Sequence, residues 1–296
     1  MQLRKQRHAS WPALALALAS LLLLAIPCNA QEWKLVWQDE FDKDGPPDPA
    51  KWGYEKGFVR NQELQFYQPE NAVCKNGLLI IEARKEKKKN PNYKAGGKGW
   101  QNREWIEYTS TCMITKNKHT FTYGKFEMRA RIDTRPGSWP AFWTLGAKGG
   151  WPEGGEVDIM EYYRGMVLAN VCHGLKGKQK WVDTKVPLEK LGGDKWSKEF
   201  HIWTMEWDSK RIDLFLDGKL LTHFNVADDD EPGKDNAFRK PHYMLINQAI
   251  GGTNGGDPSK TDFPVRLEVD WVRVFQAAEQ KKLTQLDIRQ WLVSGL

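Results

Sequence analysis

The sequence predicts an all-β fold, a sandwich of two antiparallel sheets, and three observations predict it. Many short runs of β-forming residues lie between Trp33 and Phe275, separated by turns rich in glycine and proline. No stretch in this region shows a convincing 3.6-residue amphipathic pattern. The dipeptides Asn76-Gly77 and Asp217-Gly218 are strong signals for tight hairpins. The length suits one large all-β domain, which we expect to span residues 31–276.

The first 30 residues are typical of a secretory signal peptide. Three basic residues precede an apolar run over 11–26, and small residues lead to a cleavage site after Ala30. A membrane anchor is the alternative, but the apolar run is short for a span and no basic stop follows it. The proline directly before Cys28 argues against a lipoprotein. We therefore expect a secreted or periplasmic protein that has no membrane contact once the signal is removed.

Charge and cysteine usage argue against two classes of function. The sequence carries 44 Lys+Arg and 38 Asp+Glu, a net charge of +6 that falls to +3 without the first 30 residues. No basic cluster is interleaved with aromatic residues, so we expect no nucleic-acid partner. The remaining Cys74, Cys112 and Cys172 match no zinc pattern. They allow one disulfide at most, with Cys74 and Cys112 as the conceivable pair, or buried free thiols.

The predicted strands follow in order along the chain. They share β-forming residues and flanking turn residues, and they are Trp33–Trp37, Leu78–Arg84, Lys125–Ile132, Arg211–Leu216, Lys219–Phe224 and Leu267–Phe275. The third alternates strictly, with apolar residues at every even position from Phe126 to Ile132. Segments 85–99 and 228–240 are polar and unpatterned, so we expect loops there. Residues 277–296 are rich in helix formers and predict a short C-terminal helix.

The stretch 154–163 carries the candidate chemistry. If it is a strand, Glu156 and Asp158 share one face, and the apolar residues that follow each of them share the other. Glu161 would then point the wrong way. One extra residue, a β-bulge around Met160, would turn it back beside the other two carboxylates.

Three carboxylates on one patch of sheet can supply both an acid and a nucleophile. Like charges held close together push pKa values apart, so one group stays protonated while another stays ionised. A polar face turned to solvent is the alternative, but Glu and Asp are poor strand formers. Trp139, Trp143 and Trp151 precede the stretch, and sugar rings stack on such aromatics, although some of them must be core.

Seven segments, in the same order, resemble glycoside hydrolase family 16, which includes laminarinases, agarases and carrageenases. They are Trp37–Phe41, Asn61–Tyr67, Tyr123–Glu127, Trp139–Gly146, Glu156–Glu161, Ala249–Gly252 and Val269–Val274. The resemblance implies a concanavalin-like β-jelly roll with an open concave cleft, and cleavage of an internal β-glycosidic bond with retention. It makes Glu156 the nucleophile, Glu161 the acid/base, and Asp158 the residue that orients and tunes the pair.

The resemblance also implies residues that line the cleft. They are Asn61, Trp139, Trp143, Trp151, His173 and Gln248. A lone histidine is often structural, so His173 is either a cleft residue or a structural one. No cofactor is required, but relatives hold a structural calcium, and Glu40, the Gly77 carbonyl and Asp270 match its ligands. Oxygen ligands suit calcium, and ordinary surface carboxylates are the alternative.

The sequence thus predicts a secreted, monomeric enzyme that hydrolyses internal β-1,3-glucan linkages of the laminarin type. One alternative is a β-galactan hydrolase acting on agar, porphyran, carrageenan or mucin-type chains. Others are a transglycosylase and a non-catalytic carbohydrate-binding protein, but a binder has no use for three clustered acids. Two departures from the laminarinase pattern, at 162–166 and 85–99, bear on the substrate more than on the reaction.

Overall fold

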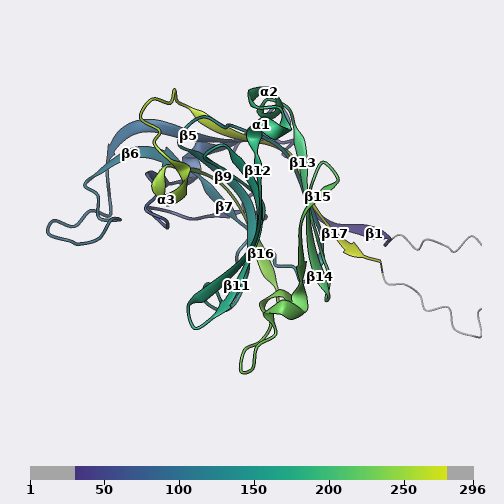
Figure 1. Cartoon of the computed structure of the whole chain (residues 1–296). Coiled ribbons are helices and arrows are strands. Elements are labelled where there is room, and N and C mark those ends of the chain that lie inside the picture. Colours follow the sequence, from purple (N-terminus) through teal and green to yellow (C-terminus); the bar gives the residue numbers. More distant parts are fainter. Residues whose placement is uncertain (1–30, 279–296) are drawn as a thin grey trace, which may run out of the picture. The chain divides into compact units, whose positions relative to one another are not determined.

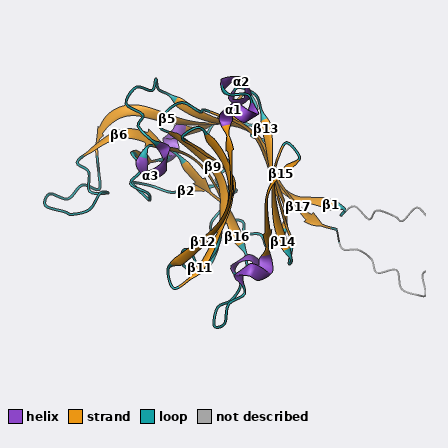
Figure 2. Ribbon diagram, in the orientation of Figure 1, coloured by secondary structure: helices purple, strands orange, loops and turns teal. Residues whose placement is uncertain are grey.

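Strands make up most of the described chain, as the sequence predicts. The computed structural model describes residues 31–278, and the part from Trp33 onward is one compact unit. Two facing sheets build this unit (Figure 1, Figure 2). The expected signal peptide and nearly all of the expected C-terminal helix lie outside the described residues.

The larger sheet has ten strands. Its order is β15 (Lys219–Asn225), β14 (Arg211–Leu216), β13 (His201–Trp207), β8 (Gly124–Ile132), β17 (Val265–Ala277), β5 (Leu78–Lys89), β6 (Trp105–Ser110) and β3 (Gln65–Tyr67), with β1 (Trp33–Asp39) beside β17 and β4 (Ala72–Lys75) beside β5. Its neighbours run antiparallel except for β3 and β6.

The smaller sheet has seven strands and carries the candidate catalytic stretch near its middle. Its order is β12 (Lys178–Pro187), β11 (Met166–Leu175), β10 (Glu156–Tyr163), β9 (Ser138–Gly146), β16 (His242–Ile250), β7 (Cys112–Ile114) and β2 (Gly53–Tyr54). This antiparallel two-sheet arrangement confirms the predicted jelly-roll sandwich.

Helices in the described region are single turns. They are η1 (Pro69–Asn71), α1 (Leu188–Leu191), α2 (Asp194–Ser197), η2 (Val226–Asp229), η3 (Ala237–Arg239) and α3 (Gly252–Gly255). Between residues 31 and 278, no helix has the length and apolar character needed to cross a membrane.

Both predicted hairpins are present. Asn76 (φ 55°) and Gly77 (φ 74°) join β4 to β5, and Lys75 pairs directly with Leu78. Asp217 and Gly218 join β14 to β15 in the same way, with φ of 48° and 76°. Positive φ at both central residues is what a type I′ turn requires, and its twist matches that of the flanking strands.

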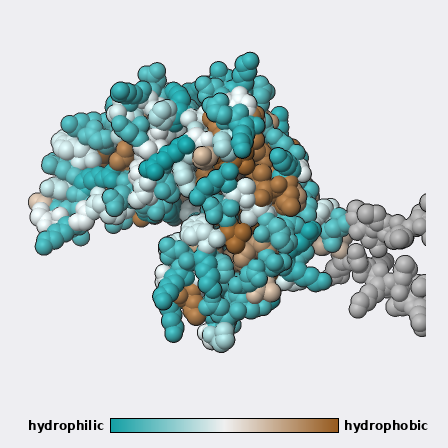
Figure 3. All heavy atoms as spheres, in the orientation of Figure 1, coloured by the Kyte–Doolittle hydropathy of each residue, from teal (hydrophilic) through white to brown (hydrophobic). Residues whose placement is uncertain are grey.

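The main hydrophobic core lies between the two sheets. Every even residue of β8 from Phe126 to Ile132 is buried there, which confirms the predicted alternation. A second cluster, which includes Tyr67, Trp143 and Leu245, lies apart from that core on β3, β9 and β16. Trp143 and Leu245 are cross-strand partners, so they share one face of the smaller sheet. A hollow opens between the lobe of β5 and β6 and the lobe of the β11–β12 hairpin (Figure 3).

One sequence expectation needs correction. Residues 85–89 are not loop: they extend β5, and Lys87 and Lys89 lie 4.9 and 5.1 Å from the ring centre of Trp105 on β6. An aromatic partner thus lets a lysine run form a strand, so the loop covers only 90–104. Of the two states left open for the cysteines, the structure shows buried free thiols at Cys74, Cys112 and Cys172, with no Cys74–Cys112 disulfide. Segment 228–240 is mainly loop as expected, but it includes the end of η2 and all of η3.

Candidate active site

The bulge predicted in β10 is present and brings the three carboxylates together. Asp158 pairs with Trp143 on β9, but the next pair is Met160 with Phe142, so one residue is extra. On the other side, the register with β11 shifts between Asp158 and Glu161. Ile159 and Met160 are both fully buried in the core between the sheets. Because two consecutive side chains enter the core, Glu161 returns to the face of Glu156 and Asp158.

Hydrogen bonds connect the carboxylates into one network. The Asn170 side chain on β11 donates to Asp158 Oδ2 (3.2 Å) and to Glu161 Oε2 (3.0 Å). The Trp139 indole N–H donates to Glu161 Oε1 at 2.7 Å. Asp158 also shares a hydrogen bond with Glu156. Sequence reasoning missed Asn170, although the strand register places it directly opposite Asp158.

Burial and mutual charge give the three acids different proton affinities. Burial, aided by the Glu156 charge, raises the pKa of Glu161 to about 7. Burial and the charges of Glu156 and Glu161 raise the pKa of Asp158 well above its usual range. Burial also raises the pKa of Glu156, but hydrogen bonds from Asp158 and Trp151 and the Arg60 charge oppose that rise. Asp158 therefore keeps a proton and donates it to Glu156, which is the best stabilised anion of the three.

The three predicted tryptophans all lie with the carboxylates, in different roles. Trp139 is buried, contacts Glu161, and packs edge-on against Tyr163 at 5.8 Å. Trp143 is 6% exposed and donates its indole N–H to Asn247. Trp151 is 50% exposed and hydrogen-bonds to Glu156. Trp151 is therefore the one of the three with a ring face free for a sugar.

Two of the predicted cleft residues face the core, and their assignment to the cleft is wrong. His173 Nδ1 lies 3.0 Å from Asp229 Oδ1, and its ring packs 5.2 Å from Phe224 of the opposite sheet. Gln248 is fully buried and donates to Ser138 Oγ at 3.0 Å. Each is one position from a residue on the carboxylate face, since alternate side chains of a strand point to opposite faces.

Asn61 and Arg60 lie side by side in the loop before β3, and only Arg60 acts on the carboxylates. Asn61 is exposed, and its amide lies 3.4 Å from Glu63 Oε1. The Arg60 guanidinium pairs with Glu55, lies 5.0 Å from the Trp143 ring centre and favours the ionised form of Glu156. Sequence reasoning missed Arg60, which directly precedes the segment that resembles laminarinases.

The family model for glycosyl hydrolases family 16 matches residues 61–273. This chain belongs to that family. It is 36% identical to a β-glucanase of Rhodothermus marinus over 88% of this chain and 94% of the relative. A family 16 chain with the network described above is a glycoside hydrolase.

This family 16 chain resembles the solved structures of a laminarinase and of a protein from work on mucin O-glycanases. One is the catalytic domain of an endo-1,3-β-glucanase (laminarinase) from Thermotoga petrophila, with a TM-score of 0.72 and 34% identity over 84% of this chain and 100% of that one. Another comes from work on endo-acting O-glycanases that human gut bacteria express to initiate mucin breakdown. Its TM-score is 0.77, with 32% identity over 83% of this chain and 92% of that one.

The residues matched to the calcium site of this family do not fit a calcium ion here. Glu40 forms a two-bond ion pair with Arg273, at 2.8 Å for each bond. Asp270 pairs with Arg129 instead. Each carboxylate is thus neutralised by a different arginine. Residues 31–278 contain no cluster of three or more His, Cys, Asp or Glu side chains that could hold a metal.

Proposed function

We propose that this protein is an exported endo-β-glycosidase that hydrolyses internal β-1,3-glucan linkages with retention. The observation that carries the proposal is the bulged β10 strand, which puts Glu156 and Glu161 on one face, where different neighbours act on the pKa of each. A retaining site needs two carboxyl groups about 5–5.5 Å apart. Glu156 and Glu161 flank Asp158 on that face and are linked through Asp158 and Asn170, so their side chains can converge to such a spacing. The β-glucanase relative and the laminarinase structure support the substrate.

The first chemical step forms a covalent intermediate. The ionised Glu156 attacks the anomeric carbon, and the bond from that carbon to the bridging oxygen breaks. Glu161, whose pKa of about 7 keeps it mostly protonated below neutral pH, gives its proton to the departing oxygen. The products are a free sugar chain end and a glycosyl ester on Glu156.

The second step releases the other half of the substrate. Glu161, now ionised, takes a proton from a water molecule while the water oxygen attacks the anomeric carbon. The ester bond to Glu156 breaks, and two inversions together give retention. Asp158 supports both steps, because its hydrogen bond to Glu156 stabilises the carboxylate as an attacking and as a leaving group. A sugar hydroxyl in place of water would make the reaction a transglycosylation.

A β-galactan substrate is the second candidate, and one specific observation favours it. The O-glycanase structure has a higher TM-score, 0.77, than the laminarinase, 0.72. The segment Tyr162–Met166 next to the triad and segment 85–99 also depart from the laminarinase pattern. Both would reshape the cleft while leaving the carboxylates unchanged.

Purified protein tested on laminarin, curdlan, agarose, desulfated keratan and mucin glycans separates the candidates. An endo-β-1,3-glucanase releases a ladder of short oligosaccharides from laminarin and curdlan, visible by product sizing. Cleavage of the galactose-containing chains alone would replace the first candidate by the second. Absence of cleavage with retained binding would mean a carbohydrate-binding protein.

Export and monomeric state complete the proposal. The basic and apolar segments of residues 1–30 support removal of a signal peptide. Sequencing the N-terminus of protein from the culture medium or periplasm should find Gln31 first, and size-exclusion chromatography should give one chain. Protein that keeps residues 1–30 in the cell would contradict export.

A further inference from the structure

Trp181 is an exposed tryptophan of β12 that the mechanism above does not use. β12 is the edge strand of the smaller sheet, and β11 separates it from β10 (Figure 2). Glu156 pairs with Cys172 on β11, and Cys172 pairs in turn with Trp181. Directly paired residues of neighbouring strands put their side chains on the same face. Trp181 therefore lies on the carboxylate face, in one row with Glu156.

A contact with the opposite sheet gives the orientation of β12 independently. The Thr184 hydroxyl donates to the Leu221 carbonyl on β15 at 2.8 Å, so the even-numbered side chains of β12 point toward the larger sheet. The odd-numbered Trp181, Asp183 and Lys185 then take the carboxylate face. Asp183 and Lys185 form an ion pair of 2.9 Å along that face.

The odd-numbered side chains of β12 are near enough to act on the catalytic site. Neighbouring strands lie ~4.7–4.9 Å apart, so β12 lies roughly 9–10 Å from β10. Burial raises the pKa of Glu161, and the Lys185 ammonium is among the groups that oppose the rise. Burial and nearby carboxylates, Asp183 among them, raise the pKa of Tyr163 to about 12. This face of β12 therefore continues the face that carries the acids.

The Trp181 ring has no partner in the described part of the chain. It is 43% exposed, no aromatic ring or cation of residues 31–278 lies against it, and its indole N–H makes no hydrogen bond there. By contrast, Trp105 lies under two lysines of β5, and Trp151 hydrogen-bonds to Glu156. Single exposed apolar residues are common on surfaces, so the place of Trp181 in the Glu156 row, more than its exposure, gives it a function.

The loop that carries Trp151 is attached to the hairpin that carries Trp181. The Glu153 carboxylate on this loop accepts a hydrogen bond of 2.8 Å from the Gly177 N–H, in the turn between β11 and β12. Two exposed tryptophans thus stand on segments that contact each other beside Glu156. A sugar chain leaving the acids on this side would meet both segments.

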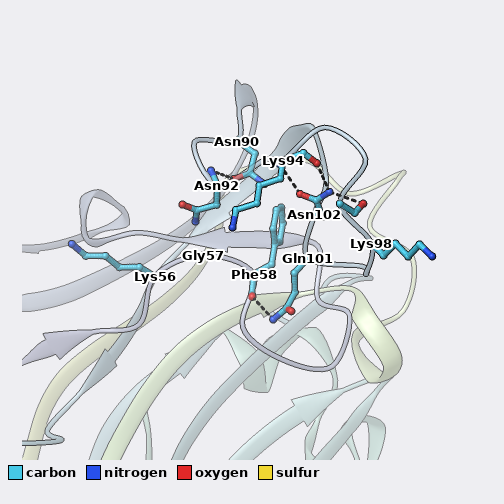
Figure 4. Close-up of a pocket in the computed structure, with 10 residues that line it drawn as sticks. Lys56, Gly57, Phe58, Asn90, Asn92, Lys94, Lys98, Gln101 and Asn102 are labelled. Atoms are coloured by element: carbon cyan, nitrogen blue, oxygen red, sulfur yellow. Dashed lines mark hydrogen bonds between the residues drawn. The ribbon is translucent and has the colours of Figure 1, made fainter.

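The cavity in the opposite lobe offers no free aromatic ring. This cavity, of about 300 Å³, lies between segment 56–58 and the 90–104 loop (Figure 4). Phe58 stands inside it, but its ring packs edge-on against Phe66 at 5.5 Å and lies 4.6 Å from the guanidinium carbon of Arg103. Lys56 and Lys98 point away from the cavity on opposite sides (Figure 4). The β12 side is therefore the better surface for a sugar.

We propose that Trp181 is a stacking platform for one sugar ring of the substrate chain, on the β12 side of the catalytic acids. This inference rests on the proposed function and adds a binding site to it. The indole would cover the apolar C–H face of the sugar ring. At the edge of that ring, the Asp183 carboxylate can accept hydrogen bonds from hydroxyl groups and the Lys185 ammonium can donate to them.

The test measures oligosaccharide binding by the full-length mature protein with Glu156→Gln, so that no substrate is consumed. The oligosaccharides form a series of increasing length, made by partial digestion of the polymer that the wild type cleaves. In that background, Trp181→Ala removes the ring and Trp181→Tyr keeps an aromatic surface. The control is Trp271→Ala, because Trp271 pairs with the outward-facing Arg129 and lies on the outer face of the larger sheet. Circular dichroism and thermal unfolding establish that the variants fold.

We expect Trp181→Ala to bind short oligosaccharides as the parent does, and to bind those long enough to reach β12 about threefold to tenfold more weakly. Trp181→Tyr should lose less, and Trp271→Ala should bind every length like the parent. An unchanged affinity at every length in Trp181→Ala, or the same loss at every length, overturns the proposal.

The wild type separates this proposal from the proposed function. If the wild type cleaves none of the polymers, the proposed function fails and the platform falls with it. If the wild type cleaves a polymer while Trp181→Ala shows no length-dependent loss, the platform alone is overturned.

Discussion

Asn170 is the residue that makes the three acids one titrating unit. Its amide donates to Asp158 and to Glu161, while Trp139 holds the second oxygen of Glu161. These donors oppose the effect of burial, which alone would raise both pKa values further. The division of labour between the acids thus depends on burial, on neighbouring charges and on the donors to each carboxyl group, and not on residue type.

Replacing Glu156 should stop the reaction, and replacing Asp158 should only slow it. Glu156→Gln keeps the shape but cannot form the ester, so we expect loss of turnover by at least ~10⁴-fold. Asp158→Asn keeps a donor for Glu156 and an acceptor for Asn170, so we expect a loss of only ~10–100-fold. Initial rates on the preferred polymer check both. Near-normal activity in a folded Glu156→Gln protein would remove the nucleophile assignment.

The pH profile should show the pKa of Glu161 directly. The proposed mechanism requires ionised Glu156 and protonated Glu161, so it predicts that kcat/KM forms a bell whose alkaline limb falls near pH 7. Asn170→Ala removes a donor to the ionised form, so the pKa of Glu161 rises and the alkaline limb moves to higher pH. The control is Asn247→Ala, because the Asn247 side chain accepts a hydrogen bond from Trp143 instead. This variant should leave the alkaline limb in place. An unchanged limb in Asn170→Ala would rule out the network.

At the scale of the strand, the bulge could be predicted and the cleft-facing residues of the neighbouring strands could not. Three acids at positions 156, 158 and 161 make sense on one face only with an extra residue, so the pattern itself indicates the bulge. Strand β16 is buried along its whole length, and β11 nearly so. Such strands show no alternation of apolar and polar residues, so nothing in the sequence fixes which face His173 or Gln248 takes.

The bulged strand also predicts the stereochemistry. If the network around Asp158 and Asn170 holds the carboxyl groups of Glu156 and Glu161 about 5–5.5 Å apart, too little room remains between them for a water to attack directly. The reaction must then pass through the ester on Glu156 and retain the β-configuration. Proton NMR of the first product, recorded before mutarotation, should show the β-anomer. An α-anomer would mean inversion and a wider gap between the carboxyl groups.

At the scale of the whole molecule, the sandwich holds a site whose buried acids lower the stability of the fold. The two sheets bury their core between them, and this rigid layer holds three acids in positions where burial disfavours their ionised forms. The sandwich and both hairpins follow from sequence patterns that repeat along the chain. The cavity between segment 56–58 and the 90–104 loop does not, because it depends on how that loop folds back on the segment.

Stability should therefore depend on pH through Glu161, with a sign that follows from its raised pKa. The folded protein binds this proton more tightly than the unfolded chain, so the contribution of Glu161 is fully favourable below pH ~4.5. It is lost as pH rises toward and through about 7. A difference of about 2.5 pKa units corresponds to ~3 kcal/mol of unfolding free energy. Each kcal/mol shifts Tm by ~2–4 °C in a domain of this size.

Glu161→Gln isolates this effect because its side chain does not titrate. The amide leaves one of the donors Trp139 and Asn170 without its acceptor, at a cost of ~1–3 kcal/mol at every pH. The pH dependence of the difference in Tm therefore identifies the contribution of Glu161. The Tm of the variant minus the Tm of the wild type should rise steadily from pH 4.5 to 8 and then level off. Titrating groups outside the three-acid network cancel in that difference, which scanning calorimetry across this range would measure. A constant difference would mean that Glu161 has an ordinary pKa in the folded protein, and Glu161 could not then serve as the acid near neutral pH.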